Sequence, residues 1–342
     1  MGHELEMDLP RHIHLGGRKS KLAVKQTEIV KQCIEERFPS IECSVLALST
    51  LGDQVQNRPL YSFGGKALWT RELEVLLLEK VDGYPQLDMI VHSLKDMPTT
   101  LPQEFELGCI LEREDPRDAV VMKKNSKYSK LADLPEGSLV GTSALRRSAQ
   151  LSKNYPHLRF ESVRGNIGTR LEKLDDDNSP FACLLLASAG LLRLNLGHRI
   201  SCFVDAPEMY HSVGQGALGV EIRKGNTCIS TLLKELEHLP STYCCLAERA
   251  LMHFLEGGCS VPIGVKTEYD QSSCILTIKG IIVSPCGTKH VEDQTSGPAF
   301  NKSEAEEVGR QLGSLLKAQG GKKILEDINF DKLSGTPVLE QT

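Results

Sequence analysis

The chain has 342 residues, and its 40 Lys and Arg against 45 Asp and Glu give a formal net charge of −5 at pH 7. This mild acidity argues against nonspecific nucleic-acid binding, which usually needs a basic face. No apolar stretch approaches membrane-spanning length, and residues 1–11 lack the apolar core of a secretory signal. We therefore expect a cytoplasmic protein of two or three domains, with no membrane and no nucleic acid among its partners.

The 11 cysteines indicate a reducing compartment. Their number is odd, they form no Cys-x-x-Cys pair, and their spacing matches no metal site, so we expect no metal ion. Cys33, Cys109, Cys183 and Cys245 lie within apolar patterns, as small buried side chains do. The low aromatic content of 5% favours a monomer.

Strand and helix signals alternate through the first part of the chain. Ser20 is the expected N-cap of a helix that ends near Pro39, and a second helix is expected over residues 72–79. Predicted strands cover residues 12–15, 41–49 and 89–92. This alternation predicts a mainly parallel sheet covered by helices.

A second unit repeats this order. Its predicted strands cover residues 138–141, 160–163 and 182–187. Each is followed by a polar or basic loop that opens a helix. Open α/β sheets bind ligands at the carboxyl ends of their strands, so these loops are the expected ligand edge.

The pattern changes after residue 213. A strand is expected at 220–222, then a long helix over 242–255 with Gly257 and Gly258 as its C-cap. The remainder predicts a separate α+β domain. Its elements are antiparallel strands at 261–267, 274–284 and 289–293, and a helix that opens with a capping box at Ser303–Glu306 and runs to about Lys317.

Arginine is concentrated where the helices of the second unit begin. Arg146 and Arg147 are adjacent after one strand, and Arg164 and Arg170 follow the next. Helix N-termini favour anions, and guanidinium groups bind carboxylate or phosphate through two parallel hydrogen bonds. These positions predict a small ligand that carries several negative charges. In the alternative interpretation, Arg146 and Arg147 are one buried and one solvated helix residue.

Two other segments could carry chemistry. Lys95 and Asp96 follow a buried strand, where the carboxylate could face a cationic intermediate or pass a proton, or the two could form a solvated turn pair. Cys259 follows two glycines, where a thiolate could be a nucleophile or an anchor, or a loop cysteine without a role. His92 is expected to pack beside its strand. Strand-entry glycines explain Gly214-Gln-Gly216 about as well as a phosphate loop does.

Taken together, these segments resemble the porphobilinogen deaminase (hydroxymethylbilane synthase) family, from His12 to about Val265. The matching motifs run in order: Arg18-Lys-Ser20 with Leu22-Ala23 and Gln26, Gly52-Asp53, Val91-His-Ser-Leu-Lys-Asp96 with Pro98, Gly141-Thr-Ser143 with Leu145-Arg-Arg147 and Gln150-Leu151, Arg164-Gly-Asn166 with Thr169-Arg170, Ala189-Gly190, Val213-Gly-Gln-Gly-Ala-Leu-Gly219, and Glu256-Gly-Gly-Cys-Ser-Val-Pro262.

The resemblance implies an α/β fold of two domains like type II periplasmic binding proteins, with the active cleft between them, and a small C-terminal α+β domain that carries the cysteine loop. Applied to this chain, the first domain covers residues 1–113 and 214–237, the second 114–213 and the third 238–342. It also implies a transferase of haem biosynthesis. A dipyrromethane cofactor, held by a thioether to Cys259, serves as primer for four porphobilinogen molecules, each of which loses ammonia. Water then releases 1-hydroxymethylbilane.

The resemblance also assigns roles to residues of this chain. Asp96 matches the catalytic aspartate, which stabilises the cation formed when ammonia leaves and moves the pyrrole proton. The cofactor-binding residues implied beside Cys259 are Ser93, Lys95, Thr142, Ser143, Arg146, Arg147, Arg170 and Gln215. The implied substrate-binding residues are Arg18, Ser20, Gln26, Arg164, Arg170 and Arg193.

Four positions depart from the family pattern. Gly17 and Ala144 stand where hydroxyl residues are common, Gly168 replaces a usual Asn, and Gly65 occupies a position that is often acidic. We expect activity with altered primer affinity or turnover. Three alternatives stay open: a paralogue of reduced activity, a noncatalytic anion-binding protein of the same architecture, and another cysteine-nucleophile enzyme. The last needs a base near Cys259, where only His253 is close in sequence.

Overall fold

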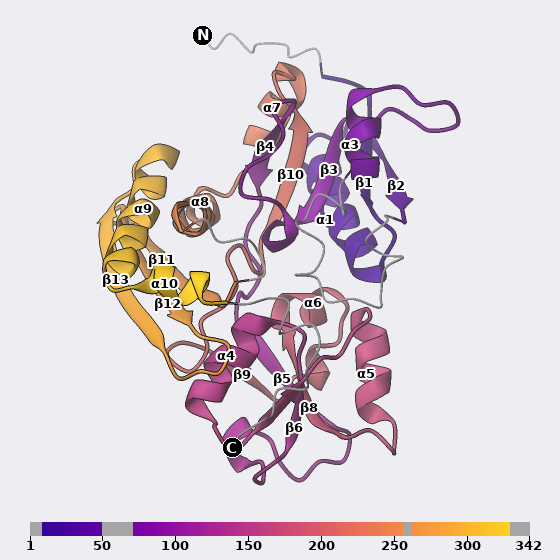
Figure 1. The fold of residues 1–342 in the computed structure, drawn as a ribbon. Helices are drawn as coiled ribbons and strands as arrows, with labels where there is room; N and C mark the ends of the chain where they lie inside the picture. The colour runs from indigo at the N-terminus through magenta and orange to yellow at the C-terminus, as the bar shows by residue number, and fades with distance from the viewer. Residues whose placement is uncertain (1–8, 50–70, 256–260, 329–342) are drawn as a thin grey trace. The chain divides into compact units, whose positions relative to one another are not determined.

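The computed structural model describes residues 9–49, 71–255 and 261–328 (Figure 1). The chain divides into two compact units. The described part of unit 1 comprises residues 9–49, 71–113 and 217–242, and that of unit 2 comprises residues 114–216, 243–255 and 261–328. The expected three-domain boundaries stay a prediction.

Unit 1 is built on a five-stranded sheet with the order β2-β1-β3-β10-β4. β1 runs parallel to β2 and β3, whereas β10 is antiparallel to both β3 and β4. Four strands therefore point one way and one is reversed. The strands are β1 (His12–Arg18), β2 (Glu42–Leu48), β3 (Met89–Ser93), β4 (Phe105–Ile110) and β10 (Leu218–Arg223).

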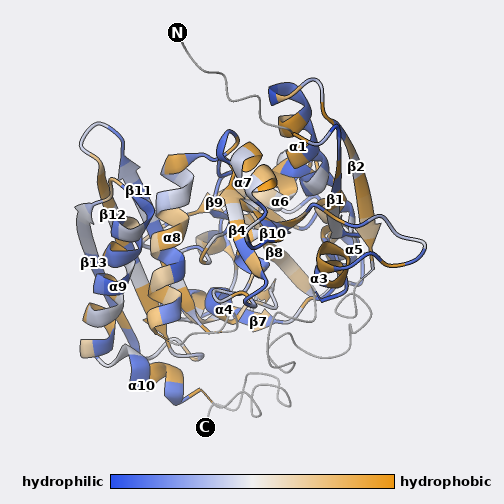
Figure 2. Cartoon of the chain, turned by 90° about the horizontal axis from the view of Figure 1, so that it is seen from above, coloured by the Kyte–Doolittle hydropathy of each residue, from blue (hydrophilic) through white to orange (hydrophobic). Residues whose placement is uncertain are grey.

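Helices cover this sheet because its strands are apolar on both faces. Val30 and Ile34 of α1 (Lys21–Arg37) pack in one cluster with Leu15 of β1. α7 (Thr227–Lys234) contributes to the same cluster, and α3 (Arg71–Leu78) packs in a second one with Ile90. Figure 2 shows hydrophobic colour over much of β2. Ser20 caps α1 as predicted, since its side chain accepts from the Ala23 N–H.

Unit 2 contains a second sheet of the same design, with the order β7-β6-β8-β5-β9. β6 is parallel to β7 and β8, and β5 is the reversed strand. The strands are β5 (Asp118–Met122), β6 (Leu139–Gly141), β7 (Arg159–Glu161), β8 (Phe181–Ala187) and β9 (Cys202–Val204), and the helices are α4 (Leu145–Asn154), α5 (Ile167–Asp175) and α6 (Ser188–Arg193). The two sheets confirm the predicted α/β class with mainly parallel strands.

The reversed strands have a consequence for the ligand edge. A reversed strand begins at the edge where the parallel strands end. Asp118 begins β5 opposite Ala187, the last residue of β8. In unit 1, Leu218 begins β10 opposite Ser93, the last residue of β3. Each sheet therefore receives side chains at its ligand edge from a strand that runs against the others.

The C-terminal part of unit 2 is a small α+β assembly, as predicted. Its sheet is antiparallel with the order β11-β12-β13, and Leu251, Ile278 and Leu312 lie in its core cluster. It comprises most of α8 (Leu239–Phe254), together with β11 (Ile263–Asp270), β12 (Ile275–Val283), β13 (His290–Pro298), α9 (Lys302–Ala318) and α10 (Gly321–Glu326). Among the described helices, none combines the length and apolarity that a membrane span requires.

Some predicted elements need correction. The capping box was placed two residues late, because Asn301 is the N-cap of α9 and accepts from the Glu304 N–H at 3.0 Å. The Glu304 carboxylate in turn accepts from the Phe300 N–H at 2.8 Å and from Asn301 Nδ2 at 2.7 Å. The sequence patterns also missed β4, β5, β9, α7 and α10. The predicted C-cap at Gly257 and Gly258 lies outside the described residues.

Replacing Asn301 by Ala is expected to destabilise the protein by about 1 kcal/mol, the usual effect of losing a side-chain N-cap. Ser303→Ala serves as the matched control, because Ser303 is inside the helix and its loss leaves the cap intact. Urea unfolding of both variants measures the difference. Equal destabilisation by the two changes would contradict the assignment of Asn301 as the cap.

Candidate active site

The predicted catalytic carboxylate lies at the ligand edge of unit 1. Asp96 ends a single 3₁₀ turn, Leu94–Asp96, that follows directly from β3. Its side chain is exposed, whereas Leu94 and Met97 on either side of it are buried. The two buried neighbours anchor the turn, and no described residue forms an ion pair with Asp96. The carboxylate is therefore exposed at the end of a turn whose flanking residues are buried.

Three other predicted residues of unit 1 engage each other or the backbone. Gln26 is buried on α1 and exchanges two hydrogen bonds with Ser93 at the end of β3, at 2.8 and 3.0 Å. The Ser20 hydroxyl accepts from the Ala23 N–H at 3.3 Å. Arg18 is half-buried at the end of β1, and Lys95 is half-buried beside Asp96. The structure thus gathers these residues at the ends of β1 and β3.

In unit 2, Thr142 and Ser143 form the loop between β6 and α4. Thr142 is buried, and its hydroxyl accepts from the Ala144 N–H at 3.2 Å. The Ser143 hydroxyl donates to the Val163 carbonyl at 2.7 Å and contacts Ser162 Oγ at 2.8 Å. These bonds fix the backbone where α4 begins. Both hydroxyls serve the loop itself.

Arg146 and Arg147 are both buried, at 6% and 7% exposure, around a carboxylate that the sequence did not reveal. Asp118 Oδ1 accepts from Arg147 Nε at 3.0 Å and Nη2 at 2.8 Å. Arg146 Nη1 lies 2.8 Å from Asp118 Oδ2 and donates to the Tyr210 carbonyl at 2.6 Å. The alternative of one buried and one solvated arginine is therefore wrong.

The electrostatics of this cluster follow from two cations around one anion. Burial alone would raise the pKa of Asp118, but the attraction of Arg146 and Arg147 and hydrogen bonds from Arg146 and Gln215 hold it well below its ordinary value. Burial lowers the pKa of Arg146, and Asp118 offsets this only in part because Arg147 repels it. The cluster retains one positive charge in surroundings that exclude water.

Two more predicted arginines, Arg164 and Arg193, are partly shielded from solvent. Neither has a described carboxylate partner at ion-pair distance. Burial lowers the pKa of Arg164, which is half-buried in the loop before α5. Burial also lowers that of Arg193, and the charge of Glu114 opposes the shift. Arg193 Nη2 donates to the Gly216 carbonyl at 2.7 Å. Both guanidinium groups would gain from a bound carboxylate.

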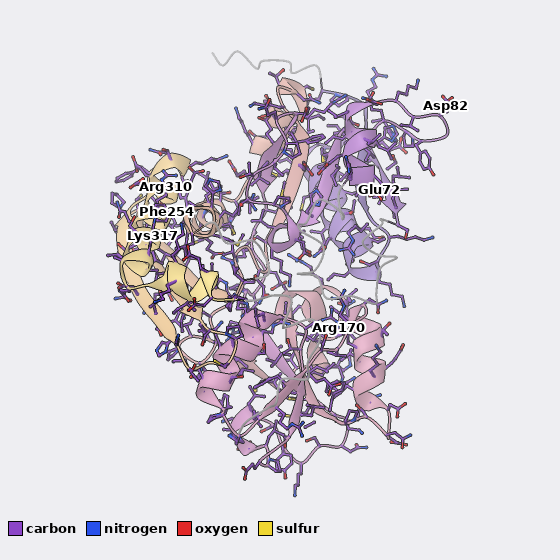
Figure 3. The ribbon with its side chains drawn as sticks, viewed as in Figure 1. Glu72, Asp82, Arg170, Phe254, Arg310 and Lys317 are labelled. Carbon is purple, nitrogen blue, oxygen red and sulfur yellow. The ribbon has the colours of Figure 1, made fainter. Side chains whose placement is uncertain are left out.

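Arg170 lies in the first turns of α5, where Figure 3 labels it. Its Nε donates to the Gly165 carbonyl at 2.7 Å, which holds the side chain over the loop that carries Arg164. Gly165 has φ 118°, a left-handed conformation that favours glycine. The loop thus brings Arg164 and Arg170 to the same helix N-terminus.

The structure shows the surroundings of three of the four positions that depart from the family pattern. A Cβ at Gly17 would overlap the Thr27 hydroxyl, which donates to the Ala23 carbonyl at 3.0 Å. Ala144 is the N-cap of α4 and provides no side-chain cap. A side chain at Gly168 would meet only Asn166 Oδ1 at 3.4 Å, so a larger residue fits there. Gly65 and the cofactor cysteine predicted at Cys259 lie outside the described residues.

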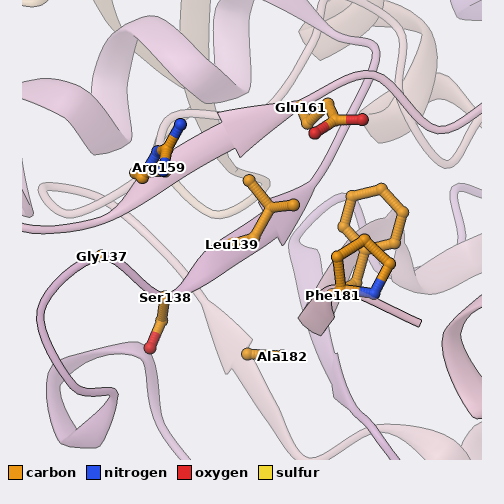
Figure 4. A pocket seen from close by; sticks show the side chains of 8 residues that line it. Gly137, Ser138, Leu139, Arg159, Glu161, Phe181 and Ala182 are labelled. Carbon is orange, nitrogen blue, oxygen red and sulfur yellow. The ribbon is translucent and has the colours of Figure 1, made fainter. Parts of the chain in front are cut away.

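A surface cavity of about 470 Å³ lies elsewhere in unit 2 (Figure 4). It is lined mainly at the beginnings of β6, β7 and β8, by Gly137, Ser138, Leu139, Arg159, Glu161, Pro180, Phe181 and Ala182. None of the predicted site residues lines it. The ligand edge, at the opposite ends of β6 and β8, is therefore distinct from this cavity.

Sequence reasoning missed three buried carboxylates near these residues. Asp118 begins the apolar strand β5, Glu221 lies within β10, and Glu248 lies within α8; each is 0% exposed. Glu221 contacts His92 Nε2 at 2.7 Å, so His92 does more than pack beside its strand. The sequence signal that could have indicated these buried carboxylates is an acidic residue inside or at the start of an apolar run.

Comparison with known proteins covers most of the chain. Residues 13–231 match the porphobilinogen deaminase dipyrromethane cofactor binding domain, and residues 242–318 match the porphobilinogen deaminase C-terminal domain. The porphobilinogen deaminase of Debaryomyces hansenii is 66% identical over 326 residues, covering 95% of this chain and 90% of that protein. Those of Candida albicans and Saccharomyces cerevisiae are 61% and 55% identical, covering 96% and 95% of this chain and 96% and 99% of their own lengths.

A solved structure, the unliganded L-cystine solute receptor of Neisseria gonorrhoeae, aligns with a TM-score of 0.36 at 14% identity, covering 76% of this chain and 100% of its own. That similarity is too weak to bear on function. The two family domains and the identity to the fungal relatives, together with the arginine-rich ligand edge, decide the assignment: the chain belongs to the porphobilinogen deaminase family.

Proposed function

We propose that this chain is a transferase with hydroxymethylbilane synthase activity, joining four porphobilinogen molecules on a dipyrromethane primer and releasing 1-hydroxymethylbilane. Among the structural observations, the one that best supports this activity is the ligand edge of unit 2. There Arg164 and Arg193 lose water while the Asp118 cluster retains a positive charge. A ligand that carries several carboxylates would neutralise these groups.

The residues at this edge fit a dipyrromethane, because each of its pyrrole rings carries an acetate and a propionate. Arg146, Arg164, Arg170 and Arg193 are the proposed carboxylate ligands. Cys259 is the proposed attachment point. The bound group supplies the pyrrole carbon to which the first substrate is joined, and the arginines orient its acid groups and exclude competing anions.

Asp96 is the proposed catalytic residue. Loss of ammonia leaves positive charge on the substrate pyrrole, and a carboxylate within contact distance stabilises that charge. The same carboxylate can accept the proton that the pyrrole ring releases after the new bond forms. The exposed position of Asp96 on a turn with buried flanks suits both tasks.

The proposal extends to location and assembly. The ten cysteines among the described residues are all free thiols, as expected in a reducing compartment, and burial raises the pKa of Cys183 to about 12. We propose a cytoplasmic monomer whose small-molecule partners are porphobilinogen and the growing oligopyrrole chain.

The intact mass of the full chain tests the activity directly. Protein made in cells that supply porphobilinogen is expected to carry one dipyrromethane adduct, and added porphobilinogen should produce a ladder of further ring masses. Cys259→Ala is expected to fold normally and to have the mass of the bare polypeptide. A bare wild-type mass would instead favour a noncatalytic anion-binding protein.

Asp96→Asn is expected to retain the primer and to lose nearly all chain growth, because the amide keeps the shape of the side chain but not its charge. The measurements are intact mass before and after addition of porphobilinogen, and the rate of porphobilinogen consumption. Ordinary turnover in this variant would remove Asp96 from the mechanism.

Arg164→Gln is expected to lower kcat/KM for porphobilinogen by about 10- to 100-fold, the scale of a lost charged hydrogen bond. Its stability should be close to that of the wild type, since Arg164 has no described ion-pair partner. Arg199→Gln is the matched control, because Arg199 pairs with Asp175 through two bonds of 2.9 Å. The control should lose stability and keep kcat/KM. The reverse pattern would contradict a substrate role for Arg164.

A further inference from the structure

We propose that Asp118 is a positioning residue: it anchors Arg147 and holds the guanidinium group of Arg146 in the orientation that receives a primer carboxylate, and Gln215 supports Asp118. This inference rests on the proposed function. It assigns Asp118 a role that the sequence motifs did not indicate, and it gives the amide of Gln215 a supporting role besides the expected cofactor contact.

The two guanidinium groups differ in how many of their nitrogens contact protein acceptors. Arg147 directs all three of its nitrogens at protein acceptors: Nε and Nη2 at Asp118 Oδ1, and Nη1 at the Leu185 carbonyl at 3.0 Å. The contacts of Arg146 with Asp118 and the Tyr210 carbonyl run through Nη1 alone. Arg147 is therefore the anchored member, and Arg146 keeps donors for a ligand.

The charges of the three side chains do not cancel. Asp118 is 0% exposed and both arginines are nearly so, which leaves little water to solvate the cluster. One carboxylate between two guanidinium groups neutralises a single charge. The remaining positive charge attracts a ligand carboxylate, while Asp118 prevents the two cations from moving apart. Without Asp118, mutual repulsion would separate them.

Gln215 is 1% exposed and contacts Asp118 directly. Its Nε2 donates to Asp118 Oδ1 at 2.9 Å and to the Pro116 carbonyl at 2.7 Å. The preceding Gly214 N–H donates to Glu248 Oε2 at 2.8 Å. Gly216 has φ 87°, and a Cβ there would overlap the Glu114 carbonyl. The loop is thus held from both sides, with the amide of Gln215 directed at Asp118.

Glu248 extends the arrangement to α8. Its other oxygen, Oε1, accepts from the Thr267 hydroxyl at 2.6 Å, so this buried carboxylate links α8, β11 and the Gln215 loop. A connected set of hydrogen bonds therefore runs from Glu248 through Gly214 and Gln215 to Asp118. The set supports the arginine pair from within unit 2.

Two substitutions separate the charge of Asp118 from its position. Asp118→Asn removes the charge and turns an amide donor towards two other donors. Asp118→Glu keeps the charge but moves it by one methylene group. Asp175→Asn is the matched control, because Asp175 also joins two cations, Arg199 at 2.9 Å and Lys124 at 3.3 Å, but contacts no predicted site residue.

The test measures primer occupancy by intact mass in full-length protein made in cells that supply porphobilinogen, with thermal unfolding in parallel. Asp118→Asn and Asp118→Glu are each expected to lower the primed fraction at least about tenfold, the scale of a lost charge-assisted hydrogen bond. Asp175→Asn should remain fully primed even if its melting temperature falls. Full priming of both Asp118 variants would overturn the inference.

A second measurement serves if Asp118→Asn does not fold. In a Cys259→Ala background, which lacks primer, the Arg147 Nε–Hε signal in ¹⁵N-arginine NMR spectra should be protected from exchange, and Arg147→Lys assigns it. Asp118→Glu should shift this signal and remove its protection. An unchanged signal would contradict the positioning role. A wild type without primer would instead refute the proposed function, so the two failures are distinguishable.

Discussion

The ion pairing of the buried Asp118 carboxylate with Arg146 and Arg147 is the interaction on which the second unit depends. Two guanidinium groups cannot leave water without an anion, and Asp118 is the fully buried anion that contacts both. Removing one member of a buried ion pair typically costs about 3–5 kcal/mol, a large part of the stability of an ordinary domain. The burial of the two arginines and the folding of this sheet therefore depend on the same carboxylate.

The two sheets have one structural feature in common. Each contains one reversed strand, and each reversed strand carries a carboxylate that is 0% exposed: Asp118 on β5 and Glu221 on β10. Asp118 pairs with arginines at the start of α4, and Glu221 contacts His92 on β3, just before Ser93 and the turn that carries Asp96. In each unit, a buried polar contact thus supports the segment that leads to the proposed ligand residues.

Local patterns predicted much of this fold. The strand that ends before Asp96, the cap at Ser20 and the strand before Ser188 follow from apolar runs and caps that neighbouring residues determine. The partner of Arg147 does not, because Asp118 is 29 residues away in sequence and meets it only through the strand order. The same limit applies to Gln215, whose burial against Asp118 arises from the strand order and not from a local pattern.

The reversed strand of the first sheet also dictates an order of assembly. In the described structure, β3 and β4 are both bonded to β10, which lies between them. Residues 218–223 reach the ribosome exit only after all of the second sheet, residues 118–204, has been synthesised. The second sheet can therefore form early. In the first sheet, the edges of β3 and β4 that pair with β10 stay open until residues 218–223 have been synthesised. Exposed strand edges can pair with strands of other chains, so the nascent chain is most prone to aggregate during that interval.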